Sequence, residues 1–363
     1  MRREPEQLVV TAASRAALTR IWIGPGLLDA AGERLFSPSG RFLIVSPPAA
    51  AAARDRIARA LAGRILANVA LDDREEAKTL AAVSRIADAA FAAGLRRDDA
   101  IVAVGGGVTS DVAGFAASVL LRGVAWNAVP TTTGAMCDAA IGGKTGVDHA
   151  AGKNLIGAFH PPRAVLIDPE AAAGLPDRDF RAGLVEAFKA AWVADAGLAS
   201  RAAASIDRIL AREEQALLSL IAGAARIKAE IVASDPREEN GRRRLLNFGH
   251  TLGHALEAAG GYRDLRHGEA VAWGIAAALE ISARRSRLPK SDADAVRGTL
   301  ARLGPFPEPV RDAARLEAYL QRDKKASAAG TSAVLLEGIG RGRVEEAVPA
   351  SEWLSAAAIM SFK

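Results

Sequence analysis

The sequence predicts a two-part fold: an α/β domain over residues 1–170, followed by a mainly α-helical domain over residues 171–363. The length of 363 residues suggests two domains. In the first part, short apolar runs alternate with helical patterns, which is typical of a parallel sheet. In the second part, helical periodicity dominates. We expect the boundary near Pro169–Pro176.

The elements of the first part follow from apolar runs and turn residues. Phe42–Val45 and Ala100–Val104 read as buried strands, and Gly94 is a plausible helix stop. The expected elements in chain order are strand 42–45, helix 49–63, strand 65–71, helix 80–93, strand 100–104 and a helix from 109 or 110 to 121.

The second part shows apolar residues at helical spacing over long stretches. A late apolar run, 332–336, predicts a short strand, and 304–309 is rich in proline and predicts a loop. The expected helices are 181–194, 200–212, 215–234, 250–259 and 269–284.

Composition excludes several classes of function. Half of the residues are hydrophobic, so the chain can bury a large core. The net charge is +5, but the basic clusters Arg242–Arg244 and Lys324–Lys325 are short, so we expect no nucleic-acid partner. A single cysteine fits a reducing cytoplasm. No run reaches the roughly 18 apolar residues of a membrane span, so we expect a soluble, cytoplasmic protein.

A glycine turn stands between the strand at 100–104 and the helix after it. Gly105, Gly106 and Gly107 let backbone N–H groups approach a phosphate, and the helix N-terminus favours its charge. The spacing is not the Gly-x-Gly-x-x-Gly fingerprint of a standard Rossmann domain. Phosphate binding and a plain tight turn both remain open for this segment.

A second glycine-rich segment, Gly142–Gly146, resembles a fragment of a phosphate-binding P-loop. Asp138 stands where that motif requires its first glycine, so we reject the P-loop interpretation. Lys144 and Lys153, expected on glycine-rich loops, still suit a phosphate or carboxylate ligand.

The histidines cluster. Three of the five histidines, His250, His254 and His267, fall within eighteen residues. His250 and His254 share a helix face at i, i+4, and by spacing alone would be a metal pair. Glu186 and Lys189 lie on an otherwise apolar helix, where a charge is costly unless paired or bound to metal. One carboxylate with two histidines would form a catalytic zinc site; two satisfied histidines and a surface ion pair are the alternative.

Taken in order, these segments resemble the 3-dehydroquinate synthase family over about residues 21–340. Each piece is modest alone, and the ordered set is specific. The matching pieces are Glu75-x-x-Lys78, Gly105–Asp111, Leu121–Val124, Val129–Thr132, Asp138, Gly142–Phe159, Val165–Asp168, Glu186-x-x-Lys189, Ile227–Glu230, Asn247–His254, His267–Glu269 and Asp323–Lys325.

The resemblance implies a Rossmann-like nucleotide-binding domain, a metal- and substrate-binding helical domain, and a role for each matched residue. Glu186, His250 and His267 would hold zinc or cobalt, whereas His254 would contact the substrate and help to move protons. Residues that would contact NAD are Glu75, Lys78, Gly106, Gly107, Asp111, Thr131, Thr132, Asp138, Lys144 and Lys153. Residues that would grip the substrate are Arg122, Lys144, Asn154, Lys189, Lys228, Arg243, Asn247 and either Lys324 or Lys325.

The implied substrate is a sugar acid phosphate, 3-deoxy-D-arabino-heptulosonate 7-phosphate. Its phosphate and carboxylate account for the many cationic residues. The implied reaction is transient oxidation by NAD, phosphate elimination, re-reduction, and an intramolecular aldol step that gives 3-dehydroquinate. The resemblance also implies a homodimer.

The chain departs from the family pattern mainly on the cofactor side. Ser46 stands after the first strand where an Asp is frequent, Thr133–Ala140 replaces a leucine-rich run, and Gly174 replaces a frequent Thr. One residue is inserted between Lys228 and Asn247, which leaves Arg242 or Arg243 as the substrate residue.

Three alternatives remain. A related sugar phosphate cyclase would act on another sugar phosphate, a glycerol-dehydrogenase-like enzyme would release NADH, and a non-catalytic relative would only bind NAD or metal. Lys228, Arg243 and Asn247 favour the heptulosonate substrate, and the complete histidine set argues against a non-catalytic relative.

Overall fold

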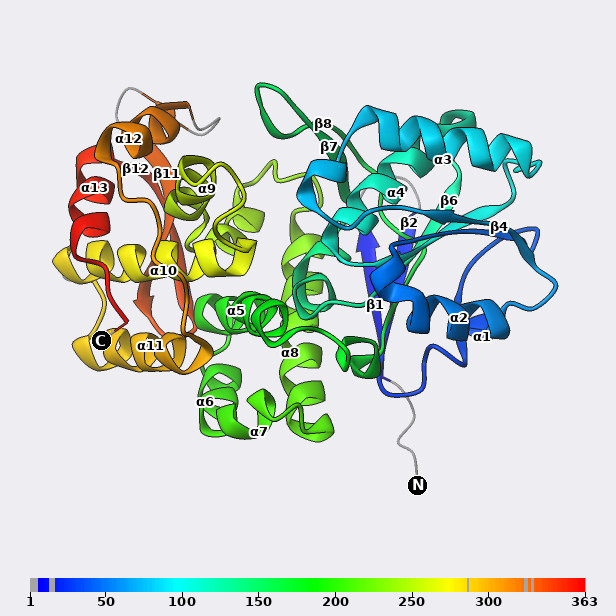
Figure 1. Ribbon diagram of the computed structural model, residues 1–363. Helices are drawn as coiled ribbons and strands as arrows, with labels where there is room; N and C mark the ends of the chain where they lie inside the picture. The colour runs from blue at the N-terminus through cyan, green and yellow to red at the C-terminus, as the bar shows by residue number, and fades with distance from the viewer. Residues whose placement is uncertain (1–5, 13–16, 286, 323–325, 328–329, 363) are drawn as a thin grey trace. The chain divides into compact units, whose positions relative to one another are not determined.

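The computed structural model describes residues 6–12, 17–285, 287–322, 326–327 and 330–362 (Figure 1). The chain divides into two compact units. Unit 1 comprises Met1–Leu175 and Lys228–Arg237, and unit 2 comprises Pro176–Ile227 and Glu238–Lys363. The first crossing, after Leu175, falls within the segment expected for the boundary. The return of Lys228–Arg237 to unit 1 has no counterpart in the predicted domains.

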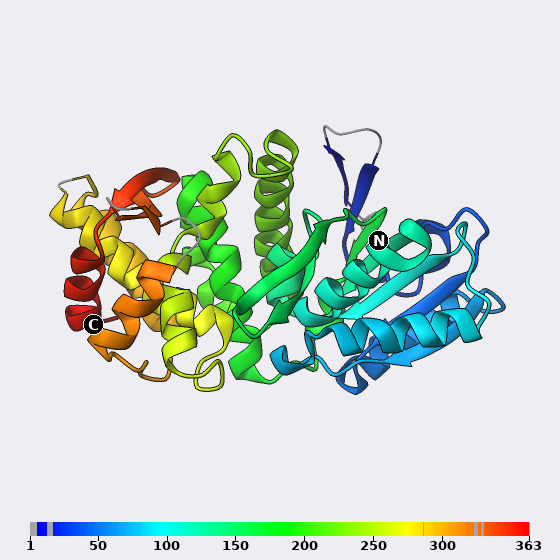
Figure 2. The same cartoon turned by 90° about the horizontal axis from the view of Figure 1, so that it is seen from above.

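Unit 1 is built on a seven-stranded sheet in the order β1-β2-β9-β6-β5-β3-β4. Its strands are β1 (Glu6–Ala12), β2 (Ala17–Ile23), β3 (Phe42–Ser46), β4 (Ile65–Ala70), β5 (Ala100–Gly105), β6 (Ala125–Pro130) and β9 (Ala164–Ile167). All neighbours pair in parallel except the antiparallel edge pair β1–β2 (Figure 2). The predicted parallel sheet is therefore confirmed.

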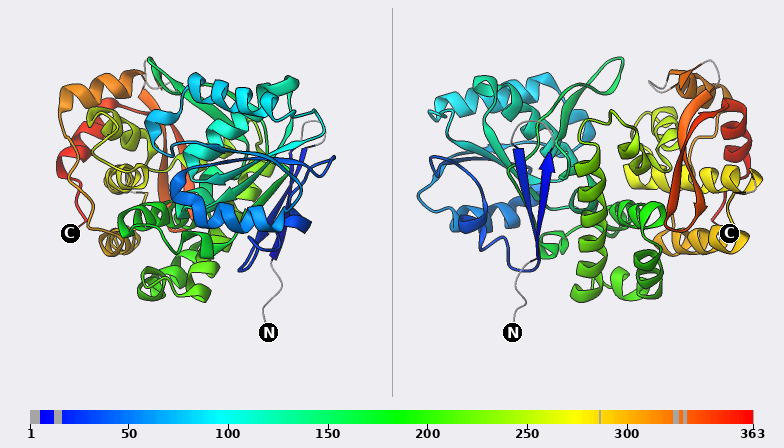
Figure 3. Two further views of the ribbon diagram at one scale, coloured as in Figure 1. Left: turned by 45° about the vertical axis from the view of Figure 1, so that its right-hand side comes forward. Right: turned by 180° about the vertical axis from the view of Figure 1, so that it is seen from behind.

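Helices cover both faces of this sheet, as Figure 3 shows. They are α1 (Ala31–Arg34), α2 (Ala51–Ala60), α3 (Leu80–Ala92) and α4 (Gly107–Val119). The central strands β3, β5 and β9 are buried along their whole length. Strands that are covered on both faces read as continuous apolar runs, which is why the sequence revealed β3 and β5.

The glycine-rich segment after residue 142 forms a hairpin and not the expected loops. Its strands β7 (Lys144–His149) and β8 (Gly152–Phe159) pair antiparallel, and β7 packs beside α4. Lys144 and Lys153 therefore lie on strands. Two glycines and several exposed positions break the apolar alternation along β8, so no strand pattern shows in the sequence.

Unit 2 is mainly helical and includes a small antiparallel sheet. The helices are α5 (Asp177–Ala194), α6 (Ala196–Ala204), α7 (Ile206–Leu210), α8 (Glu214–Ser234, whose last residues belong to unit 1), α9 (His250–Ala259), α10 (His267–Arg284), α11 (Lys290–Leu303), α12 (Ala313–Arg322) and α13 (Ala350–Ile359). The sheet has the order β10 (Ala326–Ser327), β11 (Gly330–Gly338), β12 (Arg341–Val348). No helix among the described residues combines the length and apolarity that a membrane crossing requires.

Two predictions for unit 2 need correction. The helix expected over 200–212 starts earlier and breaks at Ser205, whose backbone leaves the helical region (φ −104°, ψ 13°). The strand expected over 332–336 is part of β11, and its partner β12 was not predicted. The charged residues Arg341, Arg343, Glu345 and Glu346 interrupt β12, and only Val348 at its end is fully buried, so no apolar run marks this strand.

Candidate metal centre and nucleotide-binding turn

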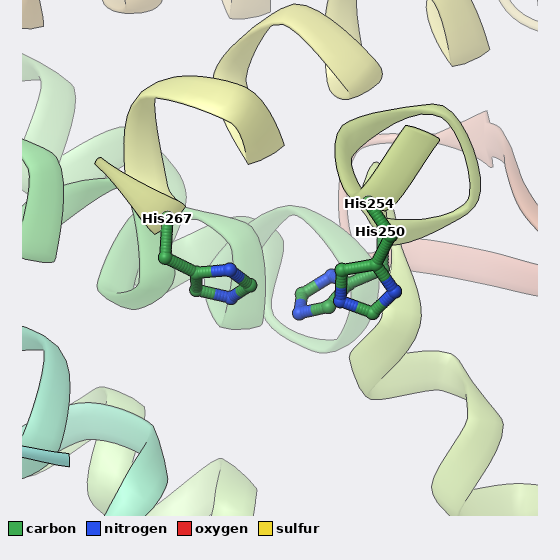
Figure 4. A group of neighbouring side chains, drawn as sticks. All are labelled: His250, His254 and His267. Atoms are coloured by element: carbon green, nitrogen blue, oxygen red, sulfur yellow. The ribbon is translucent and has the colours of Figure 1, made fainter. Parts of the chain in front are cut away.

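Two helices of unit 2 bring three histidines together. His250 and His254 lie on α9, His267 is the first residue of α10, and their rings point toward one another (Figure 4). The ring centroids are 5.1–5.8 Å apart. One nitrogen from each ring lies within 4.8 Å of the others, so the three can share a metal ion.

Close helix contact makes this cluster possible. Gly249 precedes α9 with φ +79°, and a Cβ there would lie 2.7 Å from the carbonyl oxygen of Val271 on α10. Gly268 follows His267, and a Cβ there would lie 1.8 Å from the carbonyl oxygen of Ala182 on α5. Glycine at these positions lets α9, α10 and α5 approach at backbone distance.

An ion pair fixes the start of α10, where His267 stands. Arg178 on α5 donates from two nitrogens to the buried carboxylate of Glu269, at 2.7 Å each. Glu269 also accepts the backbone N–H of Arg266 at 2.8 Å, which caps the helix. A bidentate pair to a buried carboxylate holds α5 and α10 in a defined register.

Glu186 and Lys189 lie on α5 beside the histidines. Both side chains are buried and form an ion pair, and Glu186 Oε1 lies 3.6 Å from His267 Nε2. Among the described residues, neither Glu186 oxygen has a hydrogen bond of regular geometry. A buried carboxylate without such partners, next to imidazoles, is the donor set that zinc or a similar cation takes. The residues present therefore fit a divalent metal.

The protonation state of His250 suits metal binding. Burial and the nearby charge of Lys189, with smaller contributions from His267 and His254, hold the pKa of His250 well below its usual value. Its Nδ1 lies 3.3 Å from the carbonyl oxygen of Phe248. A neutral imidazole that donates from Nδ1 presents its Nε2 lone pair for ligation.

Geometry brings all four predicted residues of this centre together, His254 included. Distances among ligand atoms group His250, His254 and His267. The ligand set expected from the family resemblance is Glu186, His250 and His267, with His254 facing the substrate. Which three act as ligands stays a prediction.

In unit 1, the glycine turn begins α4. Gly106 precedes the helix and Gly107 is its first residue. The carboxylate of Asp73 accepts the N–H of Gly106 at 2.9 Å, and from Thr109 it accepts the N–H at 3.0 Å and the hydroxyl at 2.7 Å. Burial, opposed by these hydrogen bonds, raises the pKa of Asp73. The turn therefore already holds a carboxylate in this structure, as expected of an anion-binding helix start.

The Lys78 ammonium contacts several of the residues that were predicted to bind NAD. It lies 2.8 Å from Asp111 on α4 and 3.8 Å from Glu75, and it also donates to the side chain of Asn154 on β8. Glu75 pairs with Lys153 at 3.1 Å. Five predicted site residues, assigned partly to NAD and partly to substrate, thus form one polar cluster.

Burial tunes the charges of this cluster. It raises the pKa of Asp111 to about 6, although the Lys78 ammonium opposes the shift. Burial disfavours the charged form of Lys78, but the carboxylates of Asp111 and Glu75 outweigh it, so the pKa of Lys78 is raised. A cluster that combines a permanent cation with a carboxyl group that titrates near neutrality is typical of binding and catalytic sites.

Two further residues that were predicted to contact NAD, Thr131 and Thr132, lie beside the glycine turn. Thr131 follows β6, and its N–H donates to Gly105; the Thr132 methyl group would lie 3.2 Å from a Cβ on Gly106. Both therefore line the glycine turn.

Lys228 pairs with Asp138 within unit 1. Arg122 is exposed beyond the far end of α4, about 20 Å along the helix from that turn.

The one-residue insertion between Lys228 and Asn247 left two arginines of unit 2 as candidates for the substrate-binding residue. Arg243 is buried and Arg242 is exposed. The side chain of Asn247 lies 3.5 Å from Glu238. Lys144 in unit 1 is exposed at the start of β7. Lys324 and Lys325 lie outside the described residues.

Sequence reasoning missed three carboxylates: Asp73, Asp148 and Glu257. Asp73 joins the glycine turn. Asp148 accepts the backbone N–H of Asn154 at 2.8 Å, and burial raises its pKa. Glu257 reaches His267 from α9. The available signal was position in the sequence: Asp73 lies two residues before Glu75, Asp148 lies within the matched segment Gly142–Phe159, and Glu257 lies three residues after His254.

The fold and the two clusters define a class: a Rossmann-like α/β unit joined to a helical unit with a histidine–carboxylate centre. Comparison with known proteins places the chain within that class. Residues 68–182 match the model of the 3-dehydroquinate synthase N-terminal domain, and residues 183–326 match that of the C-terminal domain. The chain belongs to the 3-dehydroquinate synthase family.

Curated relatives agree. A 3-dehydroquinate synthase of Geobacter metallireducens is 46% identical over 282 residues, covering 77% of this chain and 78% of the relative. One of Synechococcus sp. is 42% identical over 341 residues, covering 91% of this chain and 92% of the relative.

Solved structures show the same fold. The 2-epi-5-epi-valiolone synthase of Streptomyces hygroscopicus, with NAD+ and Zn2+ bound, superposes with a TM-score of 0.86 at 28% identity, over 96% of this chain and 98% of that one. A 2-deoxy-scyllo-inosose synthase with carbaglucose-6-phosphate, NAD+ and Co2+ gives 0.81 at 25% identity, over 97% and 99%. Glycerol dehydrogenase of Schizosaccharomyces pombe, at 0.60 and 15% identity, shares the fold alone.

Proposed function

We propose that this chain is a 3-dehydroquinate synthase, which converts 3-deoxy-D-arabino-heptulosonate 7-phosphate to 3-dehydroquinate and phosphate. The main support for this proposal is the family match over residues 68–326. A curated relative that is 42% identical and aligns with nine-tenths of the chain supports it further. This reaction eliminates phosphate, so the enzyme would be a carbon–oxygen lyase of aromatic amino-acid biosynthesis.

The proposed cofactors are NAD and a divalent metal, zinc or cobalt. Cyclase structures of the same fold contain NAD+ with Zn2+ or Co2+. Glu186, His250 and His267 would hold the metal, which when bound supplies Lewis acidity toward the substrate hydroxyls. The glycine turn and the Lys78 cluster would hold NAD, which when bound accepts a hydride and returns it.

The chain itself supplies position and charge. Lysine and arginine side chains provide fixed donors for an anionic sugar phosphate. We assign this task to Arg122, Lys144, Lys189, Lys228, Arg243 and Lys324, and hydroxyl contacts to Asn154 and Asn247. His254, exposed and beside the other two histidines, would hold or move a proton at a substrate oxygen.

Charge neutralisation explains why Lys189 and Glu186 are both buried. Each lies within the apolar stretch of α5, and each offsets the desolvation of the other. A cation held by Glu186 would free the Lys189 ammonium for an anionic substrate group. Lys228 and Asp138 also form an ion pair in unit 1, in which Asp138 is only partly buried.

One assay tests this proposal against its alternatives. Purified protein receives zinc, a catalytic amount of NAD and the heptulosonate phosphate, and phosphate release and carbocycle formation are followed. We expect many turnovers per NAD. Stoichiometric NADH would indicate a dehydrogenase, and turnover only with another sugar phosphate would indicate a different cyclase. Bound NAD without any turnover would indicate a non-catalytic relative.

Two wider proposals accompany the activity. We place the enzyme in the cytoplasm, since a single cysteine suits a reducing compartment. We also propose a homodimer, which sedimentation equilibrium would test as twice the mass of the chain.

A further inference from the structure

His267 stands between two carboxylates. Its Nε2 lies 3.6 Å from Glu186 Oε1, and its Nδ1 lies 3.3 Å from Glu257 Oε2. The two ring nitrogens therefore face different acids, from α5 and from α9. Glu186 belongs to the proposed ligand set, whereas Glu257 has no role in the reaction described so far.

Glu257 is placed to act on the ring and not on solvent. Its side chain is only 4% exposed, whereas that of His267 is 46% exposed. It lies seven residues after His250, two helical turns along the same face of α9. A buried carboxylate on this face is costly unless it has a polar or charged partner, and the His267 ring is such a partner.

Metal-binding histidines usually donate their second ring N–H to an outer acceptor. This contact selects the tautomer, orients the ring and makes the ligating nitrogen more basic. His250 has such an acceptor in the carbonyl oxygen of Phe248. His267 has Glu257, whose charge makes it the stronger acceptor of the two.

We propose that Glu257 is a positioning residue that holds His267 as its Nδ1–H tautomer and so directs Nε2 toward the metal beside Glu186. This inference rests on the proposed function, since it requires Glu186, His250 and His267 to bind a divalent ion. It adds to that function a residue that touches neither substrate nor cofactor and sets metal affinity through His267.

Three variants of the full chain separate the contributions of Glu257. Glu257→Leu keeps similar bulk and removes both acceptor and charge. Glu257→Gln keeps an acceptor oxygen and removes the charge. Glu280→Gln is the matched control, because Glu280 is a partly buried carboxylate on α10 that pairs with Arg297.

Zinc affinity is measured by competition with a chelator. We expect Glu257→Leu to bind zinc about 10–100-fold more weakly, the range typical for loss of an outer-shell partner. Glu257→Gln should lose less, and Glu280→Gln should match the wild type. Equal affinity in all four proteins, or an equal loss in the control, would overturn the inference and leave the proposed function standing. A wild type that binds no zinc would overturn both.

Nitrogen-15 NMR of the ring nitrogens reads the tautomer directly, before zinc is added. The chain has only five histidines, so the spectrum is tractable. We expect His267 to carry its proton on Nδ1 in the wild type and in Glu257→Gln, and to move toward Nε2–H in Glu257→Leu. His160, whose Nε2 contacts the carbonyl of Val124, serves as the internal reference. An unchanged His267 in Glu257→Leu contradicts the proposal even if that variant is less stable.

Discussion

At the scale of single residues, the three histidines share one cluster and differ in their surroundings. His250 is the least exposed of the three and has a backbone acceptor for Nδ1, and His267 stands between two carboxylates. His254 is exposed on the same helix face. These differences support separate roles for His250 and His254 despite their i, i+4 spacing.

Alanine variants of these two histidines test that separation. His250→Ala should lose metal affinity by more than the roughly 100-fold expected for an outer-shell change, and should lose activity with it. His254→Ala should retain zinc and lose turnover, because it removes a proton carrier and no ligand. Zinc content after dialysis and the phosphate-release assay measure the two effects. Equal loss of zinc in both variants would mean that His254 is a ligand.

Asp111 predicts a pH dependence of stability in the protein without NAD. Its pKa is raised to about 6 from an ordinary value of 3.8. The folded chain therefore binds this proton more tightly than the unfolded chain, and the resulting stability is present below pH 3.8 and lost as pH rises through 6. The shift corresponds to about 3 kcal/mol.

Asp111→Asn removes this titration. We expect the unfolding free energy of the wild type, measured with urea, to fall relative to that of the variant as pH rises from 4 to 8. The fall should account for most of the free energy given by the pKa shift of Asp111. Asp88→Asn, at an exposed position on α3, is the control and should track the wild type. A constant difference between wild type and Asp111→Asn over this range would refute the shifted pKa.

The sequence could identify site residues that stand out by type or spacing. Three clustered histidines and a charged pair in an apolar helix are unusual, so they were found. Asp73 and Glu257 were not, because a carboxylate near a turn or on a helix is common. Their roles depend on contacts with Thr109 and His267, residues distant in sequence or on another helix.

At the scale of elements, the start of α10 positions part of the candidate metal centre. His267, Gly268 and Glu269 are its first residues: a proposed ligand, a close contact with α5 and an anchor for Arg178. The sequence predicted that this helix begins at residue 269, whereas α10 begins at His267. Apolar periodicity does not mark a first turn that starts with His and Gly.

Gly268→Ala tests this contact. The added Cβ would lie 1.8 Å from the carbonyl oxygen of Ala182, so α10 and α5 must separate. We expect a loss of roughly 1–3 kcal/mol in unfolding free energy and weaker zinc binding, because His267 and Glu186 lie on the two displaced helices.

Gly298→Ala is the matched control. Gly298 is exposed within α11, and a Cβ there meets nothing within 4 Å. The free energy of unfolding should rise by about 0.5–1 kcal/mol with unchanged zinc affinity. Urea unfolding and chelator competition measure both variants. Normal zinc affinity in Gly268→Ala would show that the contact does not set the metal geometry.

At the scale of the whole molecule, the two units carry different candidate ligand sites. The glycine turn and the Lys78 cluster belong to unit 1, and the histidine centre belongs to unit 2. The alternation of strands and helices predicted this order of an α/β part and a helical part. The return of Lys228–Arg237 to unit 1 leaves no trace in the sequence pattern, because it begins within the regular helix α8, which ends at Ser234.

Hydrogen exchange should separate the two ligands. NAD alone should slow exchange in peptides covering 73–78 and 104–113, and zinc alone in peptides covering 183–190 and 250–270, since a ligand bound only by the folded state suppresses local opening. Peptides from α13 are the control. If NAD left 104–113 unprotected, the assignment of the glycine turn would be wrong.

The short returning segment also limits how this protein can be recombined with its relatives. Lys228 belongs to unit 1 although fifty-two residues of unit 2 precede it. A chimaera joined only after Leu175 would combine one parent's Asp138 with the other parent's Lys228. Exchange of a complete unit 1 therefore requires three junctions, after residues 175, 227 and 237, and the last two must preserve the helix α8 and the chain that follows it.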